Sequence, residues 1–357
     1  MTVATLYDLS LEELAARLAA MGEPAYRARQ LWRWAYRRLA RTYNEMTDLP
    51  AALRARLARE LPMTPVEEVG FVRSADGQTR KSLLRLADGE LIEAVLMLYD
   101  PRSDSRGRAT VCLSTQAGCA MGCVFCATGQ AGFRRNLSAG EIVAQAVTLA
   151  RHLRDEEGRR LTNVVFMGMG EPLANYEATM RAVRILNARD GFGIAARHIT
   201  ISTVGLVNGI RKLAGERLQV GLAVSLHAPD DDLRRRLIPS QRRPLSALLD
   251  AVRDYIQKTG RRVTFEYVLI DGVNDSIEHA RALGRLLRGM LCHMNLIPVN
   301  PTGADVRRPP RARVLAFQRA VEAMGVPCTV RVEKGVEIAA ACGQLRGQHA
   351  SAVARAG

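Results

Sequence analysis

Residues 108–133 read RATVCLSTQAGCAMGCVFCATGQAGF, a β-branched run followed by a loop that carries Cys119, Cys123 and Cys126. A helical pattern begins after this loop at Ser138, so the cysteines lie between a predicted strand and a predicted helix. Five more pairs of a β-branched run and a helical stretch follow along the chain. These six strand–helix units predict an α/β fold whose parallel sheet curves into a partial or complete (βα)6 barrel.

The chain before this region has two different patterns. Residues 9–60 show helical spacing of apolar residues, whereas alternation between 69 and 98, broken by ADGQ and ADGE, predicts strands joined by tight turns. Trp32, Trp34 and Tyr36 could stack on nucleic-acid bases, but we expect them to pack in the core of the helical module. We therefore predict a helical accessory domain at 1–65, a β linker at 66–108, a barrel core at 109–335 and a tail at 336–357.

Composition limits the functional classes. The 357 residues carry a net charge of +15, which suits a polyanionic partner, although 47 of the 51 basic residues are arginines that could instead solvate helix faces. Seven cysteines, three of them clustered, favour metal or thiol chemistry in a reducing compartment over a disulfide scaffold. Without a basic leader or a long apolar stretch, we expect a cytoplasmic protein with no membrane partner.

The Cys-x3-Cys-x2-Cys spacing of CAMGCVFC predicts an iron–sulfur site. Three thiolates on one short loop can each bind one iron of a 4Fe-4S cluster and leave the fourth iron open for a substrate. Structural zinc is the alternative, but zinc requires a closed set of four ligands, and no second Cys or His pair lies nearby in the sequence. The spacing resembles the radical S-adenosylmethionine (SAM) superfamily, in which SAM binds the open iron and is reduced to a 5′-deoxyadenosyl radical.

The segment FMGMGEP lies at the end of the second predicted strand. Gly168 and Gly170 would allow the backbone to approach a ligand closely, and the Glu171 carboxylate could accept hydrogen bonds from an ammonium group such as that of SAM. A glycine-rich turn alone is weak evidence, but here it falls in register with the cysteine loop.

Several motifs together resemble the RlmN family, whose members methylate carbon 2 of adenine in 23S rRNA and in a subset of tRNAs. The similarity covers nearly the whole chain and implies a partial, TIM-like (βα)6 radical SAM barrel. The motifs that carry it are YRARQLWRWAY, CLSTQAGCAMGCVFCATGQAGF, FMGMGEPLANY, ISTVG, SLHAPDDDLRRRLIP, NLIPVNPTG and AAACGQL.

The resemblance assigns roles to individual residues. It implies that Cys119, Cys123 and Cys126 bind the 4Fe-4S cluster. Cys342 would carry the methyl group and Cys112 would be its partner thiol, and Glu93 would accept a proton in the active site. The residues expected to contact SAM are Gly170, Glu171, Ser202, Ser225, Leu226, His227 and Asn300.

A radical route suits this target, because carbon 2 of adenine is electron-poor and cannot attack a methyl sulfonium. The resemblance implies that two SAM molecules are used per turnover, one to methylate Cys342 and one to generate the radical that activates the S-methyl group. After the carbon radical adds to the base, Glu93 would take the proton while Cys112 forms a transient disulfide with Cys342 and frees the product. This exchange needs two accessible thiols.

Other interpretations of the same residues stay open. Without the family context, Cys112 reads as a buried strand residue, Cys342 as an inert thiol and Glu93 as a solvent-facing carboxylate, while His227 could be a core histidine. Cys292 and Cys328 match no family role, so we expect them in the core. Glu337 and Ala339 stand where the family pattern has aspartates, which puts local RNA contacts in doubt. 

Two alternative functions remain: Cfr-like methylation of adenine carbon 8, and RNA binding without catalysis by a zinc-stabilised protein. The full MGMGEPL motif and the N-terminal module favour carbon 2. The partners that the resemblance implies are 23S rRNA, tRNA and a low-potential electron donor such as flavodoxin, with the chain acting as a monomer.

Overall fold

A ten-stranded sheet runs through the computed structural model, which describes residues 4–100, 107–332 and 334–347. Seven of its strands are parallel and follow one another in chain order, with the first one directly before the cysteine loop. The parallel strands are β4 (Arg108–Cys112), β7 (Asn163–Phe166), β8 (Ile199–Thr203), β9 (Gly221–Ser225), β10 (Val263–Leu269), β11 (Cys292–Pro298) and β12 (Cys328–Val330).

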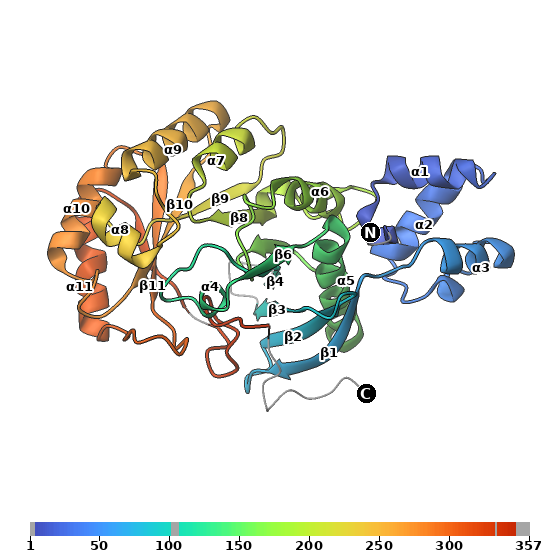
Figure 1. Cartoon of the computed structure of the whole chain (residues 1–357), viewed down its shortest axis with the longest axis horizontal. Helices are drawn as coiled ribbons and strands as arrows, with labels where there is room; N and C mark the ends of the chain where they lie inside the picture. The colour runs from blue at the N-terminus through green and yellow to red at the C-terminus, as the bar shows by residue number, and fades with distance from the viewer. Residues whose placement is uncertain (1–3, 101–106, 333, 348–357) are drawn as a thin grey trace.

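Helices follow six of these strands and cover the outside of the curved sheet (Figure 1). Among the described residues no pairing joins β12 back to the start of the sheet, so the barrel is open. The prediction of a partial (βα)6 barrel is therefore confirmed. The helices are α5 (Ala139–Glu157), α6 (Tyr176–Asn187), α7 (Val207–Leu213), α8 (Asp231–Leu237), α9 (Leu245–Thr259), α10 (Ile277–Leu287) and α11 (Arg311–Glu322), with η3 (Ala196–His198) before β8.

Local sequence signals explain where the longest helix begins and ends. The Ser138 hydroxyl accepts a hydrogen bond from the Glu141 amide, and the Glu141 carboxylate accepts one from the Ser138 amide. These two bonds form a capping box at the start of α5. Gly158 ends the helix with φ of 61°, a left-handed conformation that glycine adopts without steric cost. The sequence therefore sets both ends of the helix that follows the cysteine loop.

Three antiparallel strands extend the barrel sheet. They are β1 (Val66–Arg73), β2 (Thr79–Leu86) and β3 (Leu91–Tyr99), and β3 pairs with β4 so that Val95 lies opposite Cys112. The sequence correctly predicted strands here but presented them as a linker. Because β3 hydrogen-bonds to β4, this segment is part of the barrel sheet and brings Glu93 to the strand beside Cys112.

The N-terminal helices form a small lobe beside α5 and α6 (Figure 1). Trp32 and Tyr36 are buried and their rings meet edge to face, which confirms that they pack in the module core. Trp34 is partly exposed and donates a hydrogen bond to Asp48. The elements are η1 (Leu6–Asp8), α1 (Leu11–Ala20), α2 (Tyr26–Tyr36), η2 (Tyr43–Glu45) and α3 (Ala51–Glu60).

Polar contacts hold the module against the barrel. A carboxylate oxygen of Asp8 accepts a hydrogen bond from the Gly140 amide in the first turn of α5, at 2.7 Å. The backbone carbonyl of Asp8 accepts another from the Arg181 guanidinium on α6, also at 2.7 Å. The start of the chain is therefore anchored to two barrel helices at once.

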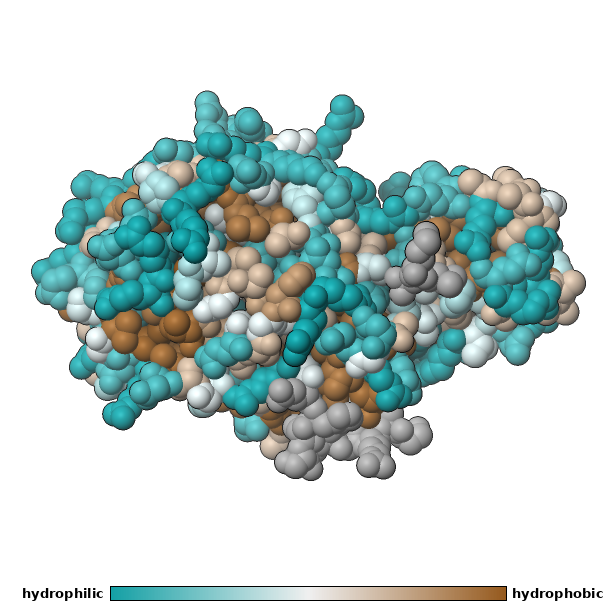
Figure 2. All heavy atoms as spheres, in the orientation of Figure 1, coloured by the Kyte–Doolittle hydropathy of each residue, from teal (hydrophilic) through white to brown (hydrophobic). Residues whose placement is uncertain are grey.

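The main apolar core lies between the sheet and its helices. Cys292 and Cys328 are buried in it as expected, and burial raises the pKa of their thiols to about 11 and about 12. Hydrophilic side chains cover most of the face shown in Figure 2, with apolar patches over the barrel. No helix in the described part of the chain is long and apolar enough to cross a bilayer.

Candidate active site

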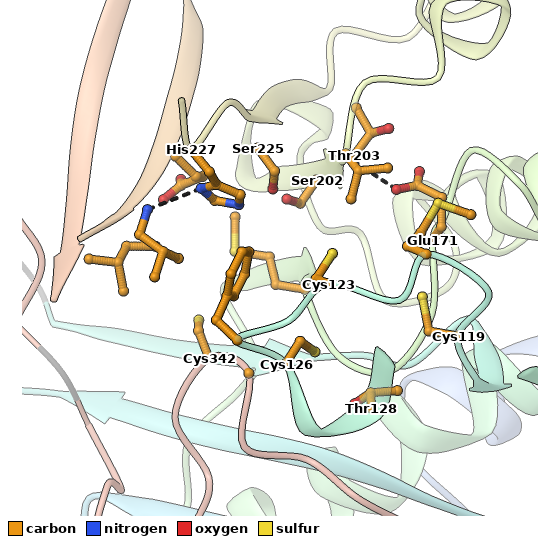
Figure 3. Close-up of a pocket in the computed structure, with 18 of the residues that line it drawn as sticks. Cys119, Cys123, Cys126, Thr128, Glu171, Ser202, Thr203, Ser225, His227 and Cys342 are labelled. Carbon is orange, nitrogen blue, oxygen red and sulfur yellow. Dashed lines mark hydrogen bonds between the residues drawn. The ribbon is translucent and has the colours of Figure 1, made fainter. Parts of the chain in front are cut away.

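An open cavity with about 930 Å³ of empty space, part of it open to solvent, lies at the carboxyl ends of the parallel strands. This is the position where barrel enzymes place their sites, because the strand-to-helix loops converge there. Figure 3 shows the cysteine loop and Cys342 on one side of the cavity, and residues from the ends of β7, β8 and β9 on the other. The predicted residues that line it are Cys119, Cys123, Cys126, Gly170, Glu171, Ser202, Ser225, His227, Asn300 and Cys342.

The cysteine loop is fixed at both ends by backbone hydrogen bonds. It leaves the short hairpin of β5 (Gln116–Gly118) and β6 (Phe133–Asn136), where the Cys119 amide donates to the Gly132 carbonyl at 2.9 Å. The Val124 amide donates to the Leu237 carbonyl at the end of α8, and Cys126 immediately precedes α4 (Ala127–Gln130). The loop is thus preorganised by its own hairpin and by a helix on the far side of the barrel.

The donor set of the loop fits an iron–sulfur cluster better than a single metal ion. Burial raises the pKa of the Cys119 thiol to about 11 and also raises those of Cys123 and Cys126, so a bound cation is needed to hold all three as thiolates. Within the described ranges, no three His, Cys, Asp or Glu side chains converge closely enough for one ion. Three thiols from one short loop that face one cavity could each bind one iron of a cubane.

Glu171 supplies a buried acceptor on the opposite wall. Its carboxylate oxygens accept hydrogen bonds from the Leu173 amide at 2.9 Å and the Val204 amide at 2.8 Å. Burial outweighs these bonds and raises the pKa of the carboxyl to about 7. A ligand ammonium would therefore find a carboxylate whose charge it can stabilise strongly, as predicted for the amino group of SAM.

The two glycines of the FMGMGEP segment are needed for the packing of the protein itself. A Cβ on Gly168 would lie 2.7 Å from the backbone of Leu113, and one on Gly170 would lie 2.6 Å from the side chain of Gln116. Gly170 also has φ of 103°, and Gln116 accepts a hydrogen bond from the Glu171 amide at 2.9 Å. These contacts hold the turn after β7 against the end of β4.

His227 is held as a neutral imidazole beside the cysteine loop. Its Nδ1 accepts a hydrogen bond from the Val268 amide at 3.0 Å, and burial together with Arg234 lowers its pKa to about 3. The ring meets Phe125 edge to face, and Nε2 carries the proton as a potential donor. His227 thus lines the cavity, whereas its neighbour Leu226 packs in the core cluster and is not among the cavity-lining residues.

Asn300 lines this cavity and a second, adjoining cavity, and it contacts the segment that carries Cys342. Its side-chain nitrogen donates to the Cys342 carbonyl at 3.1 Å, while its buried side-chain oxygen has no hydrogen-bond partner among the residues that the structure describes. An unpartnered buried acceptor next to a cavity is available to a ligand donor. This fits the predicted contact between Asn300 and SAM.

Cys342 and Cys112 line a second cavity that adjoins the first. Cys342 is partly exposed and borders both cavities, whereas Cys112 is buried at the end of β4, where burial raises the pKa of its thiol to about 12. The segment around Cys342 packs on the cysteine loop, with the Ala127 amide donating to the Gly343 carbonyl at 2.8 Å. The fold therefore brings the distant Cys342 segment against both the end of β4 and the cysteine loop that follows it.

Glu93 is buried in the sheet and does not face solvent. One carboxylate oxygen pairs with the Lys81 ammonium at 2.8 Å, and the other accepts the amides of Arg346 and Gly347 at 2.6 and 3.2 Å. The predicted proton acceptor is thus in contact with the chain segment that carries Cys342.

Comparison with known proteins gives a consistent assignment. The Radical SAM superfamily model matches residues 113–283, and the model described as the ribosomal RNA large subunit methyltransferase N-terminal domain matches residues 4–62. A probable dual-specificity RNA methyltransferase RlmN from Roseiflexus castenholzii is 52% identical, across 97% of this chain and 96% of the relative. The chain belongs to the RlmN family.

Further relatives agree with this assignment and confirm the resemblance inferred from the motifs. Ribosomal RNA large subunit methyltransferase N of Nitrosopumilus maritimus is 50% identical, across 96% of this chain and 98% of the relative. The crystal structure of a radical SAM methyltransferase from Sphaerobacter thermophilus is 58% identical and superposes with a TM-score of 0.93, covering 97% of this chain and 100% of that one. The superposition also confirms the radical SAM fold.

Two residues at the site were not found from the RlmN motifs. Lys81 reads in sequence as an ordinary polar strand residue, and only the tertiary structure shows that it pairs with Glu93. Arg331 lines both cavities, together with Cys342. Neither residue could be predicted as part of the site from the sequence, because the position of each depends on contacts between distant segments.

Ala339 stands where we expected an aspartate from the RlmN resemblance, and its backbone conformation bears on that expectation. Ala339 has φ of 52°, a left-handed conformation that Asp or Asn tolerates better than Ala. Its carbonyl accepts a hydrogen bond from Lys81 at 3.1 Å. The substitution therefore lies at the start of the segment that carries Cys342.

Proposed function

We propose that this chain methylates carbon 2 of adenine in 23S rRNA and in a subset of tRNAs through an S-methylated Cys342. The observation that carries the proposal is the position of Cys342 between two cavities. On one side it meets the three-cysteine loop and the predicted SAM ligands, and on the other it shares a cavity with Cys112. A thiol that first accepts a methyl group and later forms a disulfide needs both neighbourhoods.

The residues of the first cavity bind and orient the cofactors. Cys119, Cys123 and Cys126 would hold a 4Fe-4S cluster, and Glu171 would accept the amino group of SAM. When bound, the cluster and SAM supply a methyl group and a one-electron route to activate it. His227 and Asn300 offer a donor and an acceptor, respectively, to the rest of the ligand.

The two thiols of the second cavity complete the transfer together with buried Glu93, which contacts the Cys342 segment but is not among the described lining residues of either cavity. The S-methyl carbon of Cys342 would lose one hydrogen atom to the radical that SAM supplies and become bonded to carbon 2 of the base, and Glu93 would take the proton that carbon 2 then loses. Cys112, once its thiol gives up the proton that burial favours, would attack the Cys342 sulfur, so that a sulfur–sulfur bond forms as the sulfur–carbon bond to the product breaks. The released carbon takes up one proton to complete the methyl group, and the unpaired electron must pass to an acceptor such as the cluster. An external dithiol reductant must return the disulfide to two thiols, and a low-potential donor such as flavodoxin must supply the electron to the cluster.

Carbon 2 is favoured over carbon 8 by family membership, since relatives named RlmN are 50 to 54% identical to this chain and match it over more than nine-tenths of their length. Mass spectrometry of nucleosides from rRNA and tRNA incubated with the anaerobically reconstituted enzyme tests this directly. We expect 2-methyladenosine. Recovery of 8-methyladenosine alone would identify a Cfr-like enzyme, and a colourless, zinc-containing preparation without product would favour the non-catalytic alternative.

Substitutions of Cys342 and Cys112 should have different effects. Cys342→Ala should abolish methyl transfer, because the methyl carrier is lost. Cys112→Ala should trap a covalent protein–RNA adduct, because nothing cleaves the bond between Cys342 and the methylated base. Cys328→Ala, a buried thiol in the core, is the matched control and should form no adduct. Free methylated RNA at normal yield from the Cys112 variant would contradict this mechanism.

A further inference from the structure

Lys81 and Glu93 hold both ends of the chain segment that carries Cys342. The Lys81 ammonium donates to the Ala339 carbonyl at 3.1 Å and pairs with Glu93 at 2.8 Å. Glu93 in turn accepts the amides of Arg346 and Gly347, at 2.6 and 3.2 Å. Residues 339 and 346–347 bracket Cys342, so one buried ion pair fixes the segment on each side of the reactive thiol.

The segment also approaches β2 and β3 too closely for ordinary side chains. A Cβ on Gly335 would lie 2.7 Å from the Thr79 side chain, and one on Gly347 would lie 2.4 Å from the Leu91 carbonyl. Thr79 and Lys81 lie on β2, and Leu91 and Glu93 lie on β3. The backbone of the Cys342 segment is therefore in direct contact with the same two strands that supply the ion pair.

Burial makes this pair sensitive to the loss of either partner. The side chains of Lys81 and Glu93 are 8% and 4% exposed, and water cannot replace a missing partner at such a position. Removal of the Lys81 ammonium would leave Glu93 with an uncompensated buried charge and would leave the Ala339 carbonyl without its donor. Both effects loosen the Cys342 segment.

We propose that Lys81 is a positioning residue that orients Glu93 and, through it, holds the Cys342 segment in the arrangement where the thiol borders the SAM cavity. This inference rests on the proposed function for the roles of Glu93 and Cys342. In the structure both oxygens of Glu93 are engaged, one by Lys81 and one by the two amides. The oxygen that pairs with Lys81 keeps a free lone pair, so Lys81 can orient Glu93 without blocking the proton transfer that the proposed function assigns to it.

The first test uses Lys81→Met, which keeps the length of the side chain but removes its charge, and Lys81→Arg, which restores the charge. Hydrogen exchange of the Arg346 and Gly347 amides is measured in the cluster-loaded full chain without RNA. Because Lys81→Met loosens the carboxylate that accepts both amides, we expect about tenfold faster exchange of these amides in this variant. Lys81→Arg should recover most of the protection. Lys212→Met, an exposed lysine paired with Glu177 on the barrel surface, is the control and should leave these amides unchanged.

The second measurement is alkylation of Cys342 by iodoacetamide, read by peptide mass spectrometry with buried Cys292 as an internal reference. Faster alkylation of Cys342 alone in Lys81→Met supports the proposal. Unchanged rates at Cys342 and unchanged exchange at Arg346 and Gly347 would overturn it. Equal acceleration at Cys292 or at the β10 amides would show general destabilisation, which also overturns a positioning role.

A kinetic readout separates this inference from the proposed function. Lys81→Met should lower the rate of methyl transfer while SAM binding stays within twofold of the wild type, because none of the cavity residues that bind SAM is changed. If the wild-type enzyme yields no 2-methyladenosine, the proposed function fails, whatever the exchange data show. If the wild type is active and Lys81→Met is indistinguishable from it, the positioning role fails alone.

Discussion

Replacing Gly140 with alanine should have opposite effects on stability depending on whether Asp8 is present. A Cβ at Gly140 would lie 2.5 to 2.6 Å from three atoms of the Asp8 carboxylate, so the two cannot coexist without movement. That carboxylate accepts the Gly140 amide at 2.7 Å at the start of α5, and its second oxygen accepts the amide and hydroxyl of Thr5. The substitution therefore displaces the contact that anchors the N-terminal module.

The size of the effect follows from two opposing contributions. Losing a hydrogen bond between a helix amide and a carboxylate costs about 1.5 to 3 kcal/mol. Alanine is more favourable than glycine within a helix by about 1 kcal/mol. Gly140→Ala should therefore destabilise the wild type by about 0.5 to 2 kcal/mol. In an Asp8→Ala background the clash is absent, and the same change should be neutral or stabilising by up to about 1 kcal/mol.

Urea unfolding followed by tryptophan fluorescence measures this well, because both tryptophans of the chain, Trp32 and Trp34, lie in the module. Gly284→Ala in α10 is the control, since its Cβ would meet Met324 and its cost should be the same with or without Asp8. An equal cost of Gly140→Ala in both backgrounds would refute the docking contact as the cause.

Two further predictions concern the SAM side of the cavity. Because burial raises the pKa of Glu171 to about 7, the carboxylate is ionised only above that pH, so SAM should bind about tenfold more weakly at pH 6 than at pH 8. Isothermal titration at both values checks this, and Glu171→Gln should bind weakly at both. Gly170→Ala combines a positive φ with a clash at Gln116, so it should cost about 2 to 4 kcal/mol of stability and weaken SAM binding. Thermal unfolding of the wild type and of Gly170→Ala, with and without SAM, measures both effects. An unchanged unfolding temperature in the variant would contradict the prediction.

The barrel and the cysteine loop were readable from the sequence because both depend on short-range patterns. The alternation of β-branched runs and helical stretches is local, and Cys119, Cys123 and Cys126 lie within one loop. The site residues at strand ends followed from the same pattern, since carboxyl ends of parallel strands meet at one face of a barrel. The family resemblance supplied the roles of Cys112, Cys342 and Glu93, which composition and spacing alone did not.

The remaining features depend on contacts between distant segments. The sequence showed strands before the barrel but not that β3 pairs with β4, and it gave no reason to place Lys81 next to Glu93. Leu226 follows a strand end, yet its side chain turns into the core while His227 takes φ of 62° and faces the cavity. A residue with positive φ changes which of two adjacent side chains faces the cavity. The spacing of apolar residues in the sequence does not predict such a residue.

The continuity of the antiparallel strands with the barrel limits how the protein can be shortened. A fragment that begins at β4 would keep every cysteine of the cluster loop but would expose the whole β3-facing side of β4. A bare strand of this kind offers unpaired amides and carbonyls to other chains and promotes aggregation. The radical SAM region of this chain is therefore not expected to be a separable catalytic unit, because its first strand needs β3 as a partner before any chemistry begins.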